Sequence, residues 1–183
     1  MIGFEVQKIL LHHAVSAAMR FTTTRHPGLD HVWIVPRPDV PGVRVVGSDN
    51  SRLIAVDLKV EALEDVAQPM GIDREDVVTL LSFLNNVKGD HVWLGATTEL
   101  WYVLGHNGRL EGVPGWGKLA LAEAMVDPPV GAAHVTWDPT LLSEDIGDYL
   151  QTPCRMWVGG PADPVILADG TSRVWVMPMR EEG

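Results

Sequence analysis

The chain has 183 residues and a mass of 20.0 kDa, and 46% of its residues are hydrophobic. This composition is typical of a globular protein with one or two domains, and it excludes a disordered, collagen-like or disulfide-scaffold chain. The formal net charge is −10, whereas a protein that neutralises many DNA phosphates is usually basic. The average charge therefore argues against tight, direct binding to nucleic acid.

The cellular setting is predicted from segments that the sequence lacks. Cys154 is the single cysteine, which excludes an internal disulfide and a cysteine-rich metal site. The N-terminal residues show no basic region followed by a small-residue cleavage site. No apolar run approaches the roughly 18 residues that cross a bilayer. We therefore expect a cytoplasmic protein without a membrane partner.

The first part of the chain predicts a strand, a helix and three further strands. Apolar residues at helical spacing predict the helix over residues 7–21, and they leave Lys8, His12 and Ser16 on the opposite side. The predicted strands comprise residues 2–6, 31–35, 43–46 and 53–60. Because the strands outnumber the helices, the pattern favours an α+β fold.

The same order recurs further along the chain. Asp73 is a suitable N-cap and predicts a second helix that ends near residue 86. Pro139 suits the first position of a third helix, which extends to about Leu150. The predicted strands comprise residues 91–94, 100–104, 134–137, 155–158, 165–167 and 173–177. The sequence thus predicts three related units at residues 1–60, 61–112 and 113–183, of which the last includes a linker.

One segment invites an enzymatic interpretation. Residues 112–118 begin with Gly112, end with Lys118 and nearly match a phosphate-binding loop. Leu119 stands where such a loop needs Ser or Thr to hold magnesium. A nucleotide-binding enzyme is therefore the less favoured alternative to a Gly/Pro-rich connection. Since the sequence also lacks a nucleophile elbow and the ligand spacing of a zinc site, we expect no catalytic residue, metal or cofactor.

Two segments together resemble the bacterial DNA polymerase sliding clamp, the β subunit that tethers the replicative polymerase. Residues 47–54, GSDNSRLI, are similar to the clamp's "ATDGHRLA" hairpin. Residues 164–180, PVILADGTSRVWVMPMR, are similar to its closing strands, and residues 136–142 to the start of its last helix. The resemblance implies a DNA-clamp (processivity factor) fold built from repeated strand–helix–three-strand units.

The resemblance also implies a binding site for peptides. In the clamp family, this hairpin and the C-terminal strand form the groove for short clamp-binding motifs of polymerases and clamp loaders. Carried over residue by residue, the implied pocket comprises Ser48, Asn50, Arg52, Leu53, Pro164, Val176, Met177, Pro178 and Met179. Its leucine, valine and methionines would offer adaptable apolar surface, while Arg52 would fix the peptide backbone.

A ring around DNA is the third implication. Family members carry six such units per chain in a ring of twelve, so a ring of that size would need four chains of three units, and fewer chains would give a smaller or open assembly. We therefore expect a homo-oligomer. Closure would leave no exposed strand edges. The first helix would then face double-stranded DNA with Lys8, Arg20 and Arg25, and it would bind weakly and without sequence preference.

The charge of the other helices leaves a different reading open. The second predicted helix begins with Asp73, Glu75 and Asp76 around a single arginine, and such a segment would repel DNA. The alternative is a clamp-fold adaptor or decoy that binds the same peptides without encircling DNA.

Overall fold

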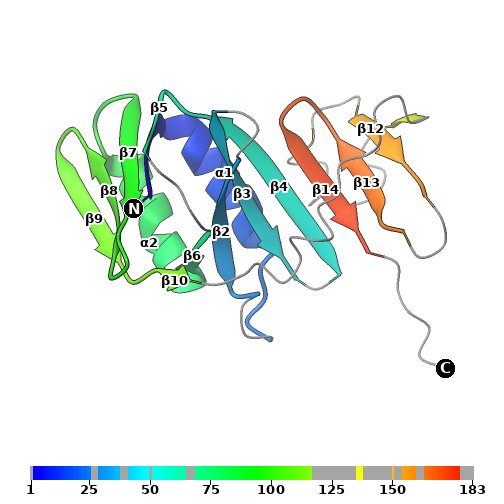
Figure 1. Cartoon of the computed structure of the whole chain (residues 1–183), viewed down its shortest axis with the longest axis horizontal. Helices are drawn as coiled ribbons and strands as arrows, with labels where there is room; N and C mark the ends of the chain where they lie inside the picture. Colours follow the sequence, from blue (N-terminus) through cyan, green and yellow to red (C-terminus); the bar gives the residue numbers. More distant parts are fainter. Residues whose placement is uncertain are drawn as a thin grey trace.

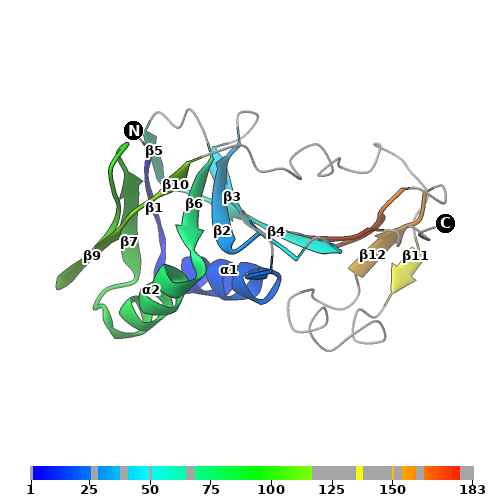
Figure 2. The same cartoon turned by 90° about the horizontal axis from the view of Figure 1, so that it is seen from below.

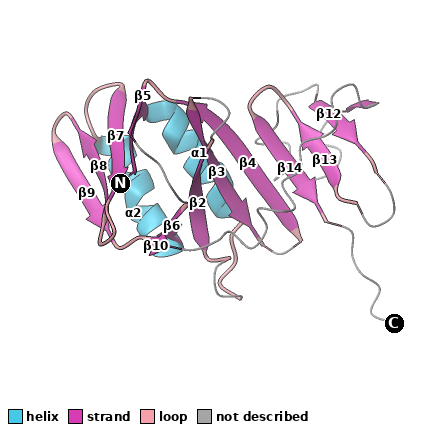
Figure 3. Cartoon of the chain, in the orientation of Figure 1, coloured by secondary structure: helices cyan, strands magenta, loops and turns pink. Residues whose placement is uncertain are grey.

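The computed structural model describes residues 2–25, 29–37, 41–49, 51–64, 69–116, 135–137, 150, 154–159 and 163–177 (Figure 1). Strands dominate this part of the chain, and two helices accompany them (Figure 3). Neither helix is long and apolar enough to cross a membrane, as far as the described residues extend.

Two successive segments of the chain contain the same order of elements. The first segment comprises β1 (Ile2–Gln7), α1 (Lys8–Arg20), β2 (His31–Pro36), β3 (Gly42–Ser48), β4 (Arg52–Lys59) and β5 (Ala62–Glu64). The second comprises β6 (Met70–Asp73), α2 (Arg74–Asn86), β7 (His91–Ala96), β8 (Trp101–Gly105), β9 (Gly108–Gly112) and β10 (Gly115–Trp116). Each helix follows directly on a strand, and four strands come after it, one more than the sequence predicts for a unit.

The two segments exchange their first strands. β1 pairs with β7 in a five-stranded sheet of order β5-β1-β7-β8-β9, and β6 pairs with β2 in the larger sheet. All of these pairings are antiparallel. The exchange ties the two segments into one body, because neither sheet is complete without a strand from the other segment.

The C-terminal strands extend the larger sheet. β11 (Val135–Trp137), β12 (Cys154–Trp157), β13 (Val165–Ala168) and β14 (Ser172–Val176) follow one another in it, and its order is β10-β6-β2-β3-β4-β14-β13-β12-β11. β14 lies alongside β4, although more than a hundred residues separate them in the sequence (Figure 1). This pairing joins the C-terminal part of the chain to the first segment.

Both helices cover the same side of the sheets (Figure 2). α1 packs on β3 and β4 through buried small and branched residues. The approach is close at Gly47, where a Cβ atom would lie 1.9 Å from the carbonyl oxygen of Ala18. The main core lies in this layer and includes Phe4, Leu11, Val15, Val45, Ile54, Ile72, Leu80 and Trp101.

The structure confirms both helices that lie in its described part and most of the predicted strands. Asp73 is the N-cap of α2, and its side chain accepts from the Glu75 amide at 2.8 Å. β5, β6, β9 and β10 were not predicted, because such short or glycine-containing strands carry little periodic signal. The predicted helix that begins at Pro139 lies outside the described residues.

The apolar face predicted for the first helix was partly wrong. Ile9 and Leu10 are 67% and 43% exposed, whereas Leu11, Ala14 and Val15 are buried. At about 100° per residue, Ile9 and Leu10 point away from the buried stripe that Leu11 begins, so they lie on the outer side of α1.

Candidate functional site

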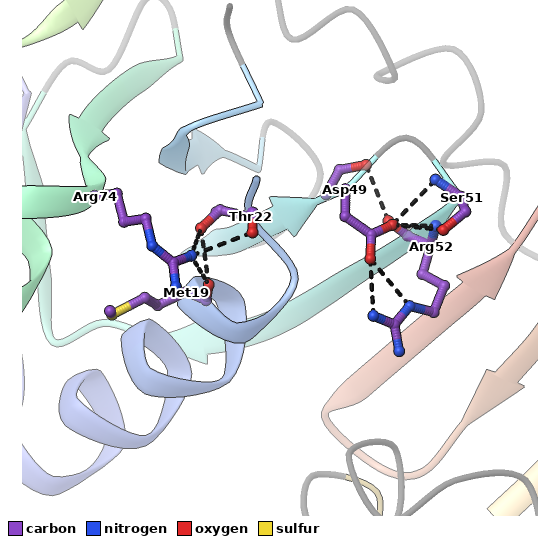
Figure 4. Close-up of polar contacts among 7 residues, drawn as sticks. Met19, Thr22, Asp49, Ser51, Arg52 and Arg74 are labelled. Carbon is purple, nitrogen blue, oxygen red and sulfur yellow. Dashed lines mark hydrogen bonds and ion pairs between the residues drawn. The ribbon is translucent and has the colours of Figure 1, made fainter. Parts of the chain in front are cut away.

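The hairpin between β3 and β4 is organised by one carboxylate, that of Asp49. Its Oδ1 accepts from the Ser51 amide at 3.0 Å, the Ser51 hydroxyl at 2.8 Å and the Arg52 amide at 2.8 Å (Figure 4). The Asp49 amide in turn donates to the Arg52 carbonyl at 3.1 Å. An aspartate that accepts from the next two or three amides is a strong local turn signal, so the sequence itself determines this hairpin.

Arg52 is held on two sides. Its Nε and Nη2 donate to Asp49 Oδ2 at 3.1 and 2.8 Å (Figure 4). Its guanidinium also lies 5.1 Å from the ring centroid of Phe21. Burial alone would raise the pKa of Asp49, but the hydrogen bonds from Arg52 and Ser51 outweigh it and lower that pKa below its ordinary value. Arg52 therefore presents a positive charge whose position is fixed before any partner arrives.

The C-terminal strand reaches this hairpin. Val176 is the direct partner of Arg52 in the β14–β4 ladder, and the Met177 amide donates to the Ser51 carbonyl at 2.9 Å. Val176 and Met177 are half-buried. The two segments that resemble the sliding clamp are thus neighbours in space.

Two of the predicted pocket residues, Ser48 and Leu53, are more deeply buried than the sequence suggested. Ser48 is 3% exposed, and its hydroxyl donates to the Arg52 carbonyl at 3.0 Å. Leu53 is 2% exposed and packs in a second buried cluster with Trp33 and Trp175. The expectation that Leu53 offers open apolar surface was wrong for this structure, because β14 places Trp175 directly opposite it.

Of the remaining predicted pocket residues, the structure describes Pro164 but not the other three. Pro164 is half-buried at the start of β13. Asn50, Pro178 and Met179 lie outside the described residues. The described part of the predicted pocket is therefore the hairpin, the end of β14 and the residue that precedes β13.

A hollow of about 460 Å³ lies between the end of α1 and the hairpin. Arg20 and Arg25, which the sequence assigned to DNA, line it together with Arg52, which the sequence assigned to peptides. Arg20 and Arg25 are exposed. The other lining residues are Thr22, Thr23, Asp49 and Ser51. Sequence reasoning missed the threonines, because a loop after a helix has no periodicity that would place it beside a hairpin.

Lys8 has a different environment from the two arginines. Its Nζ donates to the Val87 carbonyl at 3.0 Å, at the C-terminal end of α2, and its own amide donates to the Asp90 carbonyl at 2.7 Å. The ammonium group of Lys8 is thus engaged within the protein. The three cations predicted to face DNA are not equivalent.

Three side chains with metal-ligating atoms meet where β2 pairs with β6. One ligating atom from each of Asp30, His31 and Asp73 lies within 4.8 Å of the others. His31 and Asp73 are direct partners in the ladder, so only the pairing of distant strands brings them together. His31 Nδ1 lies 2.6 Å from Asp30 Oδ1, and Asp73 caps α2. Asp73 therefore has a structural role at the start of α2, while Asp30 and His31 are bonded to each other.

The segment that resembles a phosphate-binding loop contains strand residues in its described part, residues 112–116. Gly115 pairs with Gly71 and belongs to β10. At Gly112, an added Cβ would lie 2.6 Å from the Asp76 carboxylate, an acidic neighbour that disfavours a phosphate. Lys118 and Leu119 lie outside the described residues. Where the structure describes it, the predicted Gly/Pro-rich connection includes the short strand β10.

Comparison with known proteins identifies the fold. No protein-family model matches the sequence, and no curated protein matches it. Solved structures do match. A β sliding clamp of Caulobacter crescentus superposes with a TM-score of 0.81 at 12% identity, over 98% of this chain and 66% of that one. The DNA polymerase III β chain of Streptococcus pneumoniae gives 0.73 at 7% identity, over 100% and 66%. The β subunit of Thermotoga maritima gives 0.75 at 8% identity, over 100% and 65%.

The chain thus spans slightly less than two thirds of the length of the clamps that it matches. At identities of 7–12% this likeness concerns the path of the backbone, and it agrees with the α+β clamp fold that the hairpin and C-terminal segments predict. The chain has the fold of the bacterial DNA polymerase III β sliding clamps.

Proposed function

We propose that the chain is a sliding-clamp-like processivity factor for a DNA polymerase. In this proposal it acts in the cytoplasm without catalysis of its own. It associates with copies of itself around double-stranded DNA, and it binds polymerase and clamp-loader-type proteins through short peptides. One observation carries the proposal: Val176 and Met177 lie against Ser51 and Arg52, so both segments with clamp-like sequence form one surface.

The chemistry of this surface suits a short peptide with one or two large apolar anchors. Each fully buried anchor contributes about 1.5–3 kcal/mol, and ordering of the flexible peptide opposes it. Arg52, held by Asp49, supplies a fixed donor beside the half-buried Val176 and Met177. We expect a dissociation constant in the micromolar range, which corresponds to a binding free energy of about −8 kcal/mol.

Calorimetric titration of a clamp-binding-motif peptide tests the pocket. Truncation after Val176 removes Met177 and the residues beyond it, and we expect it to abolish binding. The matched control is truncation after Arg180, which removes only the last three residues and should bind like the intact chain. Equal affinity of the two truncated chains, or no binding by the intact chain, would refute the peptide pocket.

Self-association is supported by the sheet edges. β9 has the place in the second segment that β4 has in the first, and β14 covers β4. Within the described residues, β9 ends the five-stranded sheet and β11 ends the larger one. Uncovered edges of this kind are suited to pairing with a further strand, and a second copy of the chain would supply one.

A second candidate is an adaptor that binds the same peptides without encircling DNA. One observation favours it: the exposed residues of α2 beyond its first turn are uncharged, namely Val78, Thr79, Ser82, Asn85 and Asn86. This face would not repel DNA as the acidic start of the helix suggested, but it supplies no cation either. Retention on circular DNA separates the two candidates, because only an encircling assembly is released when the circle is cut.

A further inference from the structure

Four charged side chains form a compact group on the sheet face that points away from the helices. Asp57 of β4 accepts from three arginines: Arg44 Nε at 2.7 Å, Arg37 Nη1 at 2.8 Å and Arg173 Nη1 at 2.6 Å. Their side chains are only 11–25% exposed, and that of Asp57 is 16% exposed. Charge-assisted bonds in such a setting are stronger than exposed ion pairs.

The three arginines come from different places in the sheet. Arg44 belongs to β3, Arg37 follows β2 directly, and Arg173 belongs to β14. Loss of Arg173 leaves Asp57 with two partners from the first segment, so the pairing of β2, β3 and β4 stays supported. Arg173 is the member of the group that connects the C-terminal strand to the rest.

This connection bears on the register of β14. Antiparallel strands can pair in several registers, and a slip of two residues keeps the same side chains on the same face. Such a slip would carry Arg173 away from Asp57. The Asp57 amide also donates to the Thr171 carbonyl at 2.8 Å, so both main chain and side chain hold the start of β14.

The register in turn decides which residues of β14 meet the hairpin. In the observed register, Val176 faces Arg52 and the Met177 amide reaches Ser51. A slip would put other residues beside Arg52. Buried polar groups select one register in some proteins, as a single buried Asn does in coiled coils.

We propose that Asp57 and Arg173 are positioning residues for peptide recognition, because their ion pair sets the register that presents Val176 and Met177 beside Arg52. This inference rests on the proposed peptide pocket. Arg37 and Arg173 both donate to Asp57 Oδ2, yet only Arg173 belongs to the C-terminal strand. That difference provides a matched pair of variants.

The experiment compares Arg173→Gln with Arg37→Gln and includes Arg173→Lys as a conservative variant. A clamp-binding-motif peptide is titrated into each by calorimetry, and hydrogen exchange is measured at the Val174, Val176 and Met177 amides. We expect Arg173→Gln to weaken peptide binding about tenfold, the size of coupling that neighbouring residues show, and to speed exchange at Met177. Arg37→Gln should change affinity less than about twofold even if it lowers the unfolding midpoint as much. Arg173→Lys should recover part of the affinity.

Equal losses of affinity in the two glutamine variants would show a merely structural role and overturn the inference. Unchanged exchange at Met177 in Arg173→Gln would overturn it as well, whatever the affinities. If the unmodified chain binds no peptide, the proposed function fails. The exchange measurement then still decides whether Arg173 sets the register of β14.

Discussion

Lys8 and Arg74 hold the C-terminal ends of each other's helices. Lys8 is the first residue of α1 and donates to the Val87 carbonyl at the end of α2. Arg74 is the first residue of α2 and donates from Nη1 to the Met19 carbonyl at 2.8 Å, at the end of α1 (Figure 4). A cation at a helix C-terminus satisfies open carbonyls and complements the helix dipole. The two segments therefore use equivalent positions for the same reciprocal contact.

This contact predicts that Lys8 and Arg74 stabilise the fold. Lys8→Met should lower the free energy of unfolding by about 1 kcal/mol, and Arg74→Met by about 1–3 kcal/mol because it makes more bonds. Urea unfolding measures both values. The exposed Arg25→Met is the control, with a change below about 0.5 kcal/mol. An equal effect of all three substitutions would contradict reciprocal capping.

The native mass tests self-association. We expect an assembly larger than the 20.0 kDa chain at micromolar concentration, because open strand edges favour pairing. A ring of twelve units needs four copies if each chain supplies three units. It needs three copies if each chain supplies four units, the number that two thirds of a six-unit clamp implies. Light scattering distinguishes these numbers, and a negative-stain image shows whether a central hole exists. A strictly monomeric mass would refute the ring and favour the adaptor.

Charge reversal tests the cations at the end of α1. The double change Arg20→Glu and Arg25→Glu should reduce retention on circular DNA and lower the salt slope by about 1–2, since each neutralised phosphate contributes about 0.9. Lys59→Glu with Arg155→Glu makes the same change of net charge at exposed strand residues and should leave retention unaltered. If the two pairs behave alike, net charge alone governs retention and this end of α1 does not contact DNA.

The carboxylate of Asp57 predicts acid sensitivity. Burial alone would raise its pKa, but Arg44, Arg173 and Arg37 together lower it below the ordinary 3.8. A group whose pKa is lower in the folded state stabilises the fold above its unfolded pKa, and the contribution is lost as pH falls through the folded value. Stability should therefore decrease below about pH 4. Asp57→Asn should cost about 2–4 kcal/mol at pH 7 and reduce this dependence. Urea unfolding from pH 7 to pH 2.5 measures both effects, and an unchanged pH profile in the variant would assign the loss to other groups.

Nucleotide turnover tests the enzymatic alternative. We expect no hydrolysis of ATP or GTP, because Leu119 replaces the magnesium-binding hydroxyl and Gly115 is part of a strand. A phosphate-release assay with magnesium measures it. Turnover that disappears in Lys118→Ala would restore the nucleotide-binding interpretation.

Local patterns were sufficient for much of the architecture. The apolar spacing along α1 and α2, the cap at Asp73 and the turn at Asp49 each depend on residues within a few positions of one another. Because such features depend on neighbouring residues only, the sequence alone was enough to predict them. The hairpin and C-terminal segments also sufficed to indicate the clamp fold.

Long-range pairing decided the rest. The exchange of β1 and β6, the burial of Leu53 under Trp175, and the meeting of Arg20 with Arg52 in one hollow all join residues that are distant in sequence. Lys8 has the charge and helical position of a DNA contact, yet the packing of α1 against α2 directs it to a carbonyl. Charge and periodicity describe what a side chain can do, whereas the tertiary structure selects its partner, because strand pairing depends on non-local contacts that no short pattern contains.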